Sequence, residues 1–132
     1  MAIFADTSAL YALLDANDGN HERSARIWRQ IMASDDDVVT TNYVLVETFA
    51  LVQSRLGLEA VREFQESVVP VLQIEFITAD VHRLGIAALL AAERRNLSLV
   101  DCVSFEVMRD SGIKSAFAFD DHFRKYGFSM VP

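Results

Sequence analysis

The sequence predicts an α/β protein, a three-layer α/β/α sandwich with a mainly parallel central sheet. Apolar segments of strand length alternate along the chain with segments of helix length. Neighbouring parallel strands need a long crossover, usually a helix, so this alternation favours parallel pairing with helices over both faces of the sheet. The chain has 132 residues, of which 52% are hydrophobic, and this is enough for one core. We therefore expect residues 1–132 to form a single domain.

The first half of the chain is expected to contain two strands and four helices. The strands cover residues 1–5 and 38–40, and the helices cover residues 8–14, 21–33, 42–56 and 58–69. The first strand is an unbroken apolar run, and the stretch DANDGN then supplies a turn with Asn20 as N-cap of the second helix. Three aspartates form a solvated turn before the second strand, and Gly57 ends the third helix.

The second half is expected to contain three strands and three helices. The strands cover residues 74–77, 115–119 and 128–131, and the helices cover residues 79–95, 99–111 and 122–126. Ser98 and Asp101 match the [ST]-x-x-[DE] pattern that begins a helix, and Gly112 follows the end of the same helix. Parallel strands place their carboxyl ends at one edge of the sheet, where ligands bind in folds of this class.

Charge and cysteine content limit the environment of the protein. The formal net charge of −7 argues against binding nucleic acid or an anionic membrane through a broad basic face, although cations bound to clustered carboxylates would offset it. The single cysteine, Cys102, cannot form an intramolecular disulfide, and we expect it to be a small buried residue. No segment has the pattern of a signal peptide or a membrane span, so we expect a cytoplasmic protein.

Four acidic residues occupy positions that the apolar pattern does not need. Asp6 and Asp120 each follow a predicted strand, Asp101 lies in the first turn of a helix, and Glu47 projects from an apolar helix. Simpler structural roles also fit. Asp6 and Asp101 are suited to capping helices, and Glu47 can pair with Arg55.

Mutual repulsion makes such a group of acids informative. Two like charges about 5 Å apart repel by roughly 3 kcal/mol at an effective dielectric constant of 20. A cluster of carboxylates therefore needs a cation or protons, and carboxylate oxygens suit Mg²⁺ or Mn²⁺. The sequence thus predicts a divalent metal site at the carboxyl edge of the sheet. The pattern leaves open whether Asp120 or its neighbour Asp121 faces that site.

Four stretches of the sequence resemble the PIN-domain ribonuclease family, and within it the VapC-type toxins of bacterial toxin–antitoxin pairs. They are FADTSALYALLD, VETFAL, LSLVDC and FAFDDHFRKYGF, in this order along nearly the whole chain. The resemblance implies an endoribonuclease that hydrolyses RNA phosphodiester bonds with the help of Mg²⁺ or Mn²⁺. It also implies a cognate antitoxin protein as partner and a homodimer, with no role for a membrane.

The same resemblance assigns roles to individual residues. The residues that match the acidic metal-binding and catalytic positions of the family are Asp6, Glu47, Asp101 and Asp120. Ser8 and Thr48 match hydroxyl positions beside these acids and are expected to steady their orientation. One departure from the family pattern is Ala118, where many relatives carry a threonine or serine.

Two other functions are compatible with parts of the sequence. A PIN-like fold that has lost catalysis would bind RNA or protein, and Ala118 slightly favours this reading. A phosphoacceptor receiver domain also has acids at strand ends. It usually carries paired acids after the first strand and a late lysine at a strand end, whereas this chain has a single acid there and Lys114 precedes its strand.

The remaining polar residues give weaker signals. Several basic residues either form solvated faces or contact RNA phosphates: Arg23, Arg26, Arg29, Arg94, Arg95, Arg124 and Lys125. His21, His82 and His122 are expected to be surface or turn residues, with His122 the strongest candidate for an exception because it neighbours Asp120. Ser104, one turn after Asp101, either contacts the site or packs in the core.

Overall fold

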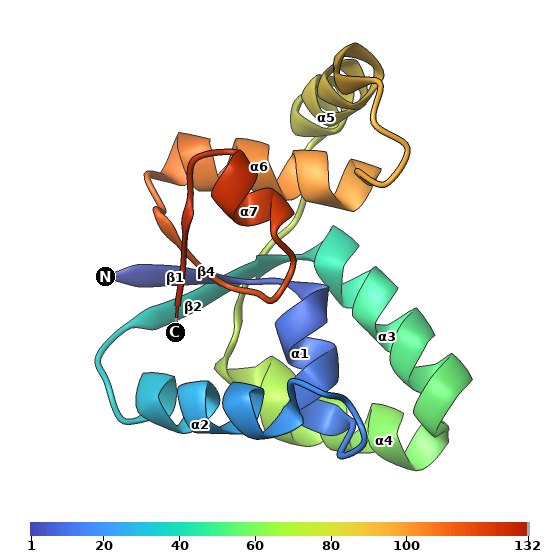
Figure 1. Cartoon of the computed structure of the whole chain (residues 1–132), viewed down its shortest axis with the longest axis vertical. Helices are drawn as coiled ribbons and strands as arrows, with labels where there is room; N and C mark the ends of the chain where they lie inside the picture. Colours follow the sequence, from blue (N-terminus) through green and yellow to red (C-terminus); the bar gives the residue numbers. More distant parts are fainter. Residues whose placement is uncertain (132) are drawn as a thin grey trace.

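The computed structural model describes residues 1–131 and shows a parallel sheet between two layers of helices (Figure 1). The elements are β1 (Ala2–Ala5), α1 (Thr7–Leu14), α2 (His21–Met32), β2 (Asp37–Thr41), α3 (Asn42–Leu56), α4 (Leu58–Glu63), β3 (Gln73–Glu75), α5 (Ala79–Ala92), α6 (Leu99–Ser111), β4 (Ser115–Phe117), α7 (His122–Lys125) and β5 (Ser129–Met130). A π-helical turn (Phe64–Val68) and a 3₁₀ turn (Val69–Val71) connect α4 to β3. Among residues 1–131, no helix has both the length and the apolar composition needed to cross a membrane.

The sheet has the strand order β3-β2-β1-β4-β5, and every neighbouring pair is parallel. The chain builds β1, β2 and β3 in one direction and then returns to the other side of β1 to add β4 and β5. The strand order therefore reverses between β1 and β4. In parallel sheets, ligands bind beyond the carboxyl ends of the strands at such a reversal.

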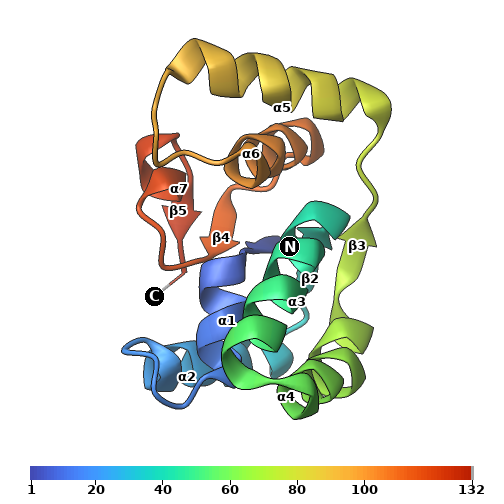
Figure 2. The ribbon, with the colours of Figure 1, turned by 90° about the vertical axis from the view of Figure 1, so that its right-hand side faces the viewer.

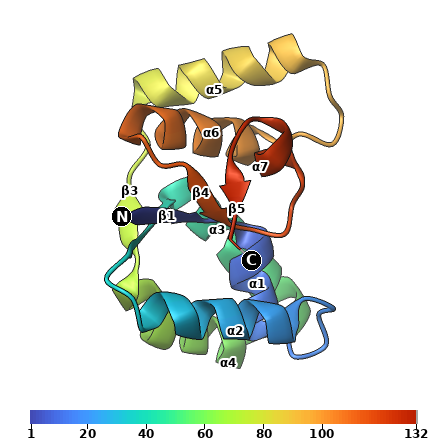
Figure 3. The ribbon, with the colours of Figure 1, turned by 60° about the vertical axis from the view of Figure 1, so that its left-hand side comes forward.

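Helices cover both faces of the sheet, as the alternating pattern predicted. Helices α5, α6 and α7 lie on one face, and α1, α2 and α4 lie on the other (Figure 2). The same two layers are visible when the molecule is turned the other way (Figure 3). The predicted three-layer α/β/α sandwich is confirmed, and the sheet is parallel throughout.

Aromatic side chains fill the core on both sides of the central strands. On one side Phe4 of β1 and Phe105 of α6 pack against Phe123 of α7, with ring centroids 6.3 and 5.1 Å apart, respectively. On the other side Trp28 of α2 stacks on Phe117 of β4 at 6.0 Å. These contacts fix α2, α6 and α7 against β1 and β4, which are the two strands that carry Asp6 and Asp120 at their ends.

Several expected elements are shorter than the sequence pattern indicated; the strands expected over residues 74–77 and 128–131, for example, are Gln73–Glu75 and Ser129–Met130. The helix expected over residues 58–69 is regular only to Glu63, because a π-helical turn follows and Pro70 lies in the 3₁₀ turn. The helix expected to reach residue 95 ends at Ala92, where Glu93 has the left-handed φ of 51°. The strand expected to reach residue 119 ends at Phe117, and the amide of Phe119 bonds to the Ser8 hydroxyl instead of a strand.

Helix starts follow their predicted caps with one exception. Ser98 and Asp101 form the expected capping box. Asn20 occupies the N-cap position of α2, but its side chain makes no capping hydrogen bond. Its own backbone N–H instead donates to the Asp18 carboxylate, as part of the turn before the helix.

A close approach between α5 and α6 depends on Gly85. A Cβ atom at this position would lie 2.5 Å from Val103 Cγ2. Val103 is fully buried and β-branched, so it has little freedom to move away. We expect Gly85→Ala to lower the free energy of unfolding by about 1–2 kcal/mol, because the overlap outweighs the gain in helix propensity.

Urea unfolding measures this effect, and Gly19→Ala is the matched control. A Cβ at Gly19 meets nothing within 4 Å, so the control is expected to keep the stability of the wild type. Equal stability of the Gly85→Ala variant and the wild type would show that α5 does not depend on this approach.

Candidate functional site

Asp6 follows β1 directly and caps helix α1. Its Oδ2 accepts hydrogen bonds from the Ser8 backbone N–H at 3.2 Å and from Ser8 Oγ at 2.8 Å. Its own N–H donates to the Phe117 carbonyl oxygen of β4 at 3.0 Å. The side chain is buried, with only 4% of the residue exposed. The capping role expected of Asp6 is confirmed, and it holds the carboxylate at the carboxyl edge of the sheet.

The Ser8 hydroxyl connects the ends of β1 and β4. It donates to Asp6 and accepts the backbone N–H of Phe119 at 2.9 Å. Phe119 immediately precedes Asp120, so this one hydroxyl fixes the spacing between two of the predicted acids. Ser8 thus has the supporting position that the sequence assigned to it, although its contact with the β4 segment was not predicted.

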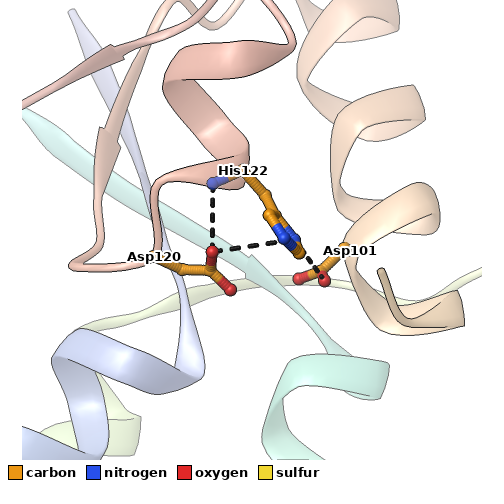
Figure 4. A group of neighbouring side chains, drawn as sticks. All are labelled: Asp101, Asp120 and His122. Carbon is orange, nitrogen blue, oxygen red and sulfur yellow. Dashed lines mark hydrogen bonds and ion pairs between the residues drawn. The ribbon is translucent and has the colours of Figure 1, made fainter. Parts of the chain in front are cut away.

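Asp101 lies in the first turn of α6 and is buried. Its Oδ2 accepts the Ser98 N–H at 3.1 Å and lies 3.3 Å from His122 Nδ1. The two roles weighed from the sequence, helix capping and membership of an acidic site, are therefore compatible. The cap uses one side of the carboxylate, and His122 contacts it from α7 (Figure 4).

Asp120, and not Asp121, points into the group. Asp120 Oδ1 accepts the His122 N–H at 3.0 Å and lies 3.6 Å from His122 Nδ1. Asp121 is exposed and pairs with Arg124 at 3.0 Å. Ligand atoms from Asp101, Asp120 and His122 all lie within 4.8 Å of one another, which is close enough for one metal ion to contact all three. Figure 4 shows the imidazole between the two carboxylates.

The interpretation of His122 as a surface or turn residue is wrong. The residue is only 7% exposed, because Phe123 anchors α7 in the core and carries His122 inward. His21 and His82 are half-buried, and both form local contacts: His21 Nδ1 lies 2.8 Å from the Ala12 carbonyl oxygen and His82 Nδ1 lies 2.5 Å from Tyr43 Oη. The position of His122 beside Asp120 in the sequence was the one signal that indicated a different role.

Glu47 projects from α3 and is half-buried. The salt bridge with Arg55 considered from the sequence is not formed within residues 1–131. The Arg55 guanidinium lies over the Tyr11 ring instead, 5.3 Å from its centroid. No basic side chain within residues 1–131 forms an ion pair with the Glu47 carboxylate.

Thr48 contacts a second threonine and no carboxylate. Its hydroxyl lies 3.0 Å from Thr7 Oγ1 and 2.7 Å from the Val44 carbonyl oxygen. The Thr7 hydroxyl donates to the Val44 carbonyl oxygen at 3.3 Å, and its closeness to Glu47 offsets part of the effect of burial, which raises the pKa of Glu47. Thr48 thus reaches Glu47 only through Thr7, and not by the direct contact with an acid that its position beside Glu47 suggested.

The pKa values show that all four acids interact. The pKa of Asp6 is raised to about 7, chiefly by burial; the hydrogen bonds from Ser8 oppose the rise, and the charges of Asp101 and Glu47 add to it. Burial also raises the pKa of Glu47, with added repulsion from Asp101 and Asp120. The charges of the four acids therefore influence one another, but only Asp101 and Asp120, with His122, bring ligand atoms within 4.8 Å of one another; Asp6 and Glu47 are not members of that group.

The donor set fits a divalent cation. Within residues 1–131, no lysine or arginine forms an ion pair with any of the four acids, and His122 is the only basic side chain that contacts them. Several carboxylate oxygens and one imidazole nitrogen are suitable ligands for a divalent metal, and a bound cation would offset the burial and the repulsion that raise the pKa values of Asp6 and Glu47.

Three nearby residues have structural roles. Ser104 Oγ donates to the Val100 carbonyl oxygen at 2.8 Å, so it packs within α6. Cys102 is buried as expected, and burial raises the pKa of its thiol. Ala118 is buried and brings no hydroxyl to the site, where Ser8 already binds the adjacent segment.

Comparison with known protein families identifies the class to which this chain belongs. Residues 3–129 match the PIN-domain family, and the chain belongs to it. The resemblance found in the four sequence motifs is thereby confirmed.

Particular relatives come from Mycobacterium tuberculosis. In strains CDC 1551 / Oshkosh and H37Rv, the proteins named 23S rRNA-specific endonuclease VapC20 are 40% identical over 131 residues, which cover 98% of this chain and 97% of the relative. The crystal structure of M. tuberculosis VapC20, described as a sarcin–ricin loop cleaving toxin, aligns with a TM-score of 0.87 at 36% identity, covering 98% of each chain.

The raised pKa of Asp6 predicts how the stability of the metal-free protein depends on pH. The pKa is about 7 in the fold and close to 3.8 in an unfolded chain. The protonated carboxyl therefore contributes its full stability below pH 4 and loses that contribution as the pH rises through 7. We expect the free energy of unfolding, relative to the Asp6→Asn variant, to fall by on the order of 4 kcal/mol between pH 4 and pH 8.

Urea unfolding in EDTA across this pH range measures the difference between the two proteins. Asparagine does not titrate, so the variant removes the contribution of Asp6 and leaves that of the other groups. A difference that stays constant with pH would contradict the buried, repelled state of Asp6.

Proposed function

We propose that this protein is a divalent-metal-dependent endoribonuclease that hydrolyses RNA phosphodiester bonds. The observation that carries the proposal is a set of four acids without lysine or arginine partners in the described chain, two of which bring ligand atoms within 4.8 Å of one another and of His122. The four acids are Asp6, Glu47, Asp101 and Asp120. Membership of the PIN-domain family supports this chemistry and argues against the receiver-domain alternative.

The four acids would hold the metal, and Mg²⁺ or Mn²⁺ suits their oxygen-rich donor set. When bound, the cation supplies positive charge that stabilises the phosphate in the transition state. The side chains that orient these acids come from the same chain. Ser8 fixes Asp6 through its hydroxyl, His122 contacts Asp101 and Asp120, and Thr48 acts on Glu47 through Thr7.

The attacking group is inferred to be water. Ser104 donates its hydroxyl hydrogen to a backbone carbonyl, and burial raises the pKa of Cys102. Neither residue has the features of an activated nucleophile. Hydrolysis by water therefore agrees with the side chains present near the acids.

The comparisons support a narrower proposal for substrate and partners. The relatives named for cleavage of 23S rRNA align over nearly the full length of this chain. We infer that this protein is the toxin of a toxin–antitoxin pair and cleaves 23S rRNA at the sarcin–ricin loop. We further infer that it acts as a single domain in the cytoplasm, forms a homodimer and is inhibited by a cognate antitoxin protein.

RNA cleavage tests the proposed site directly. We expect the wild type to cut a sarcin–ricin stem–loop RNA in Mg²⁺ or Mn²⁺ and to lose this activity in EDTA. Asp6→Asn and Asp101→Asn are each expected to lower the cleavage rate by at least about 100-fold, because each removes a carboxylate that would bind the metal. The rate is measured from labelled RNA on denaturing gels.

Asp121→Asn is the matched control, because Asp121 is acidic, adjacent to Asp120 and directed away from the site. Its cleavage rate is expected to equal that of the wild type. Undiminished cleavage in EDTA or by the Asp6→Asn variant would refute the proposed site. Tight RNA binding without cleavage in either metal would favour the alternative, a binding module that has lost catalysis.

A further inference from the structure

Helix α2 carries three exposed arginines, Arg23, Arg26 and Arg29. Within residues 1–131, none of the three forms an ion pair with an aspartate or glutamate. Four arginines on other helices, by contrast, pair with an acid three residues away: Arg62, Arg83, Arg109 and Arg124. Arg55, Arg94 and Arg95 also form no ion pair within residues 1–131, but only α2 carries three such arginines, which concentrates positive charge locally in a protein with a net charge of −7.

The row begins beside the carboxylate site. The Arg23 guanidinium lies over the Phe119 ring, 5.1 Å from its centroid. Phe119 is bonded through its N–H to Ser8 and directly precedes Asp120. This contact with Phe119 places Arg23 next to the segment that delivers Asp120 to the site.

Arg26 and Arg29 lie progressively farther from the site than Arg23, because α2 runs along β4. Trp28, further along α2, stacks on Phe117, so the helix runs from the carboxyl edge of the sheet toward its amino edge. Arg26 and Arg29 line a shallow hollow on the exposed side of α2 together with His21, Glu22 and Ala25. Glu22 is the only acidic residue among those lining it. The three arginines span about 9 Å of helix axis, a length that neighbouring phosphates of one strand can follow.

We propose that Arg23, Arg26 and Arg29 form a binding surface for the phosphate backbone of the RNA, with Arg23 contacting the phosphate nearest the cleavage site. This inference rests on the proposed ribonuclease function, because it assumes that RNA reaches the acids. Arginine suits the role because its planar guanidinium donates two parallel hydrogen bonds to a phosphate. Phe119 holds Arg23 in place and so lowers the cost of ordering it.

The arginine surface also explains how an acidic protein can bind RNA, which is itself negatively charged. The four acids repel a polyanion, and the protein as a whole is acidic. The positively charged arginines on one side of the site attract the RNA phosphates and so counter the repulsion from the acids. An acidic protein segment could use the same charges, but continuity with the site through Phe119 and Asp120 favours RNA as the occupant.

The test measures binding of a fluorescein-labelled sarcin–ricin stem–loop RNA as a function of salt. Every protein carries Asp6→Asn, so that the RNA is not cut. We expect Arg23→Gln to weaken binding on the order of tenfold. The triple variant Arg23→Gln, Arg26→Gln and Arg29→Gln is expected to reduce the slope of log Kobs against log salt by about 2, because each lost phosphate contact removes about 0.7.

Arg62→Gln is the matched control, since it removes the same charge from an exposed site on α4 where Arg62 pairs with Glu59. Its affinity and salt slope are expected to equal those of the parent. Glutamine is a good helix former, and far-UV circular dichroism confirms that α2 is retained. An unchanged affinity and slope in the triple variant would overturn the proposal.

A cleavage assay with the protein carrying Asp6 distinguishes this proposal from the proposed function. If that protein cuts the RNA while the triple substitution changes neither binding nor slope, the arginine surface is refuted and the ribonuclease stands. If it does not cut but binding depends on the arginines, the ribonuclease proposal fails and with it the placement of Arg23 beside a cleavage site, while RNA binding by the three arginines stands. If the arginines affect capture of an acidic protein partner and not of RNA, the inference for RNA is refuted.

Discussion

Burial of carboxylates, reinforced by their mutual repulsion, is the constraint on which the site depends. Asp6 is buried deeply enough that its pKa rises to about 7, and the charges of Asp101 and Glu47 add to the effect of burial. Glu47 experiences the charges of Asp101 and Asp120. Without a cation, ionisation of the buried acids costs free energy, and protonation of part of the group lowers that cost. Binding of a metal ion would offset the same cost.

Local hydrogen bonds stabilise this arrangement, because most of the acids also have a structural role. Asp6 caps α1, and Asp101 completes the capping box of α6. Asp120 accepts the backbone N–H of His122 at the start of α7. Each of these three carboxylates therefore accepts a backbone N–H at one oxygen, and its other oxygen accepts no hydrogen bond within residues 1–131. The local hydrogen bonds and the active-site geometry are consistent with each other.

The connection between the two strand ends comes from Ser8. One hydroxyl holds the Asp6 carboxylate and the Phe119 amide, and so joins the end of β1 to the segment after β4. The same segment carries Phe119, on which Arg23 of α2 rests. In this account the acids, their spacing and the approach of the substrate all depend on the residues that surround the strand reversal.

Much of this could be predicted from the sequence, because the signals were local. The strand before Asp6 is an apolar run, and the capping pattern around Asp101 lies within four residues. The structure confirmed both. The contact between Ser8 and Phe119 joins residues 111 positions apart, and no local pattern encodes it. The burial of His122 was missed for the same reason, since it depends on how Phe123 packs against Phe4 and Phe105.

The central claim is that the four carboxylates share a divalent cation, and anomalous diffraction from crystals soaked in Mn²⁺ tests it most directly. We predict an anomalous peak bounded by the carboxylates of Asp6, Glu47, Asp101 and Asp120, at about 2.0–2.3 Å from the ligating oxygens. The peak should be lost in crystals of the Asp101→Asn variant. Ordered Mn²⁺ elsewhere on the protein, with none among these acids, would contradict the account.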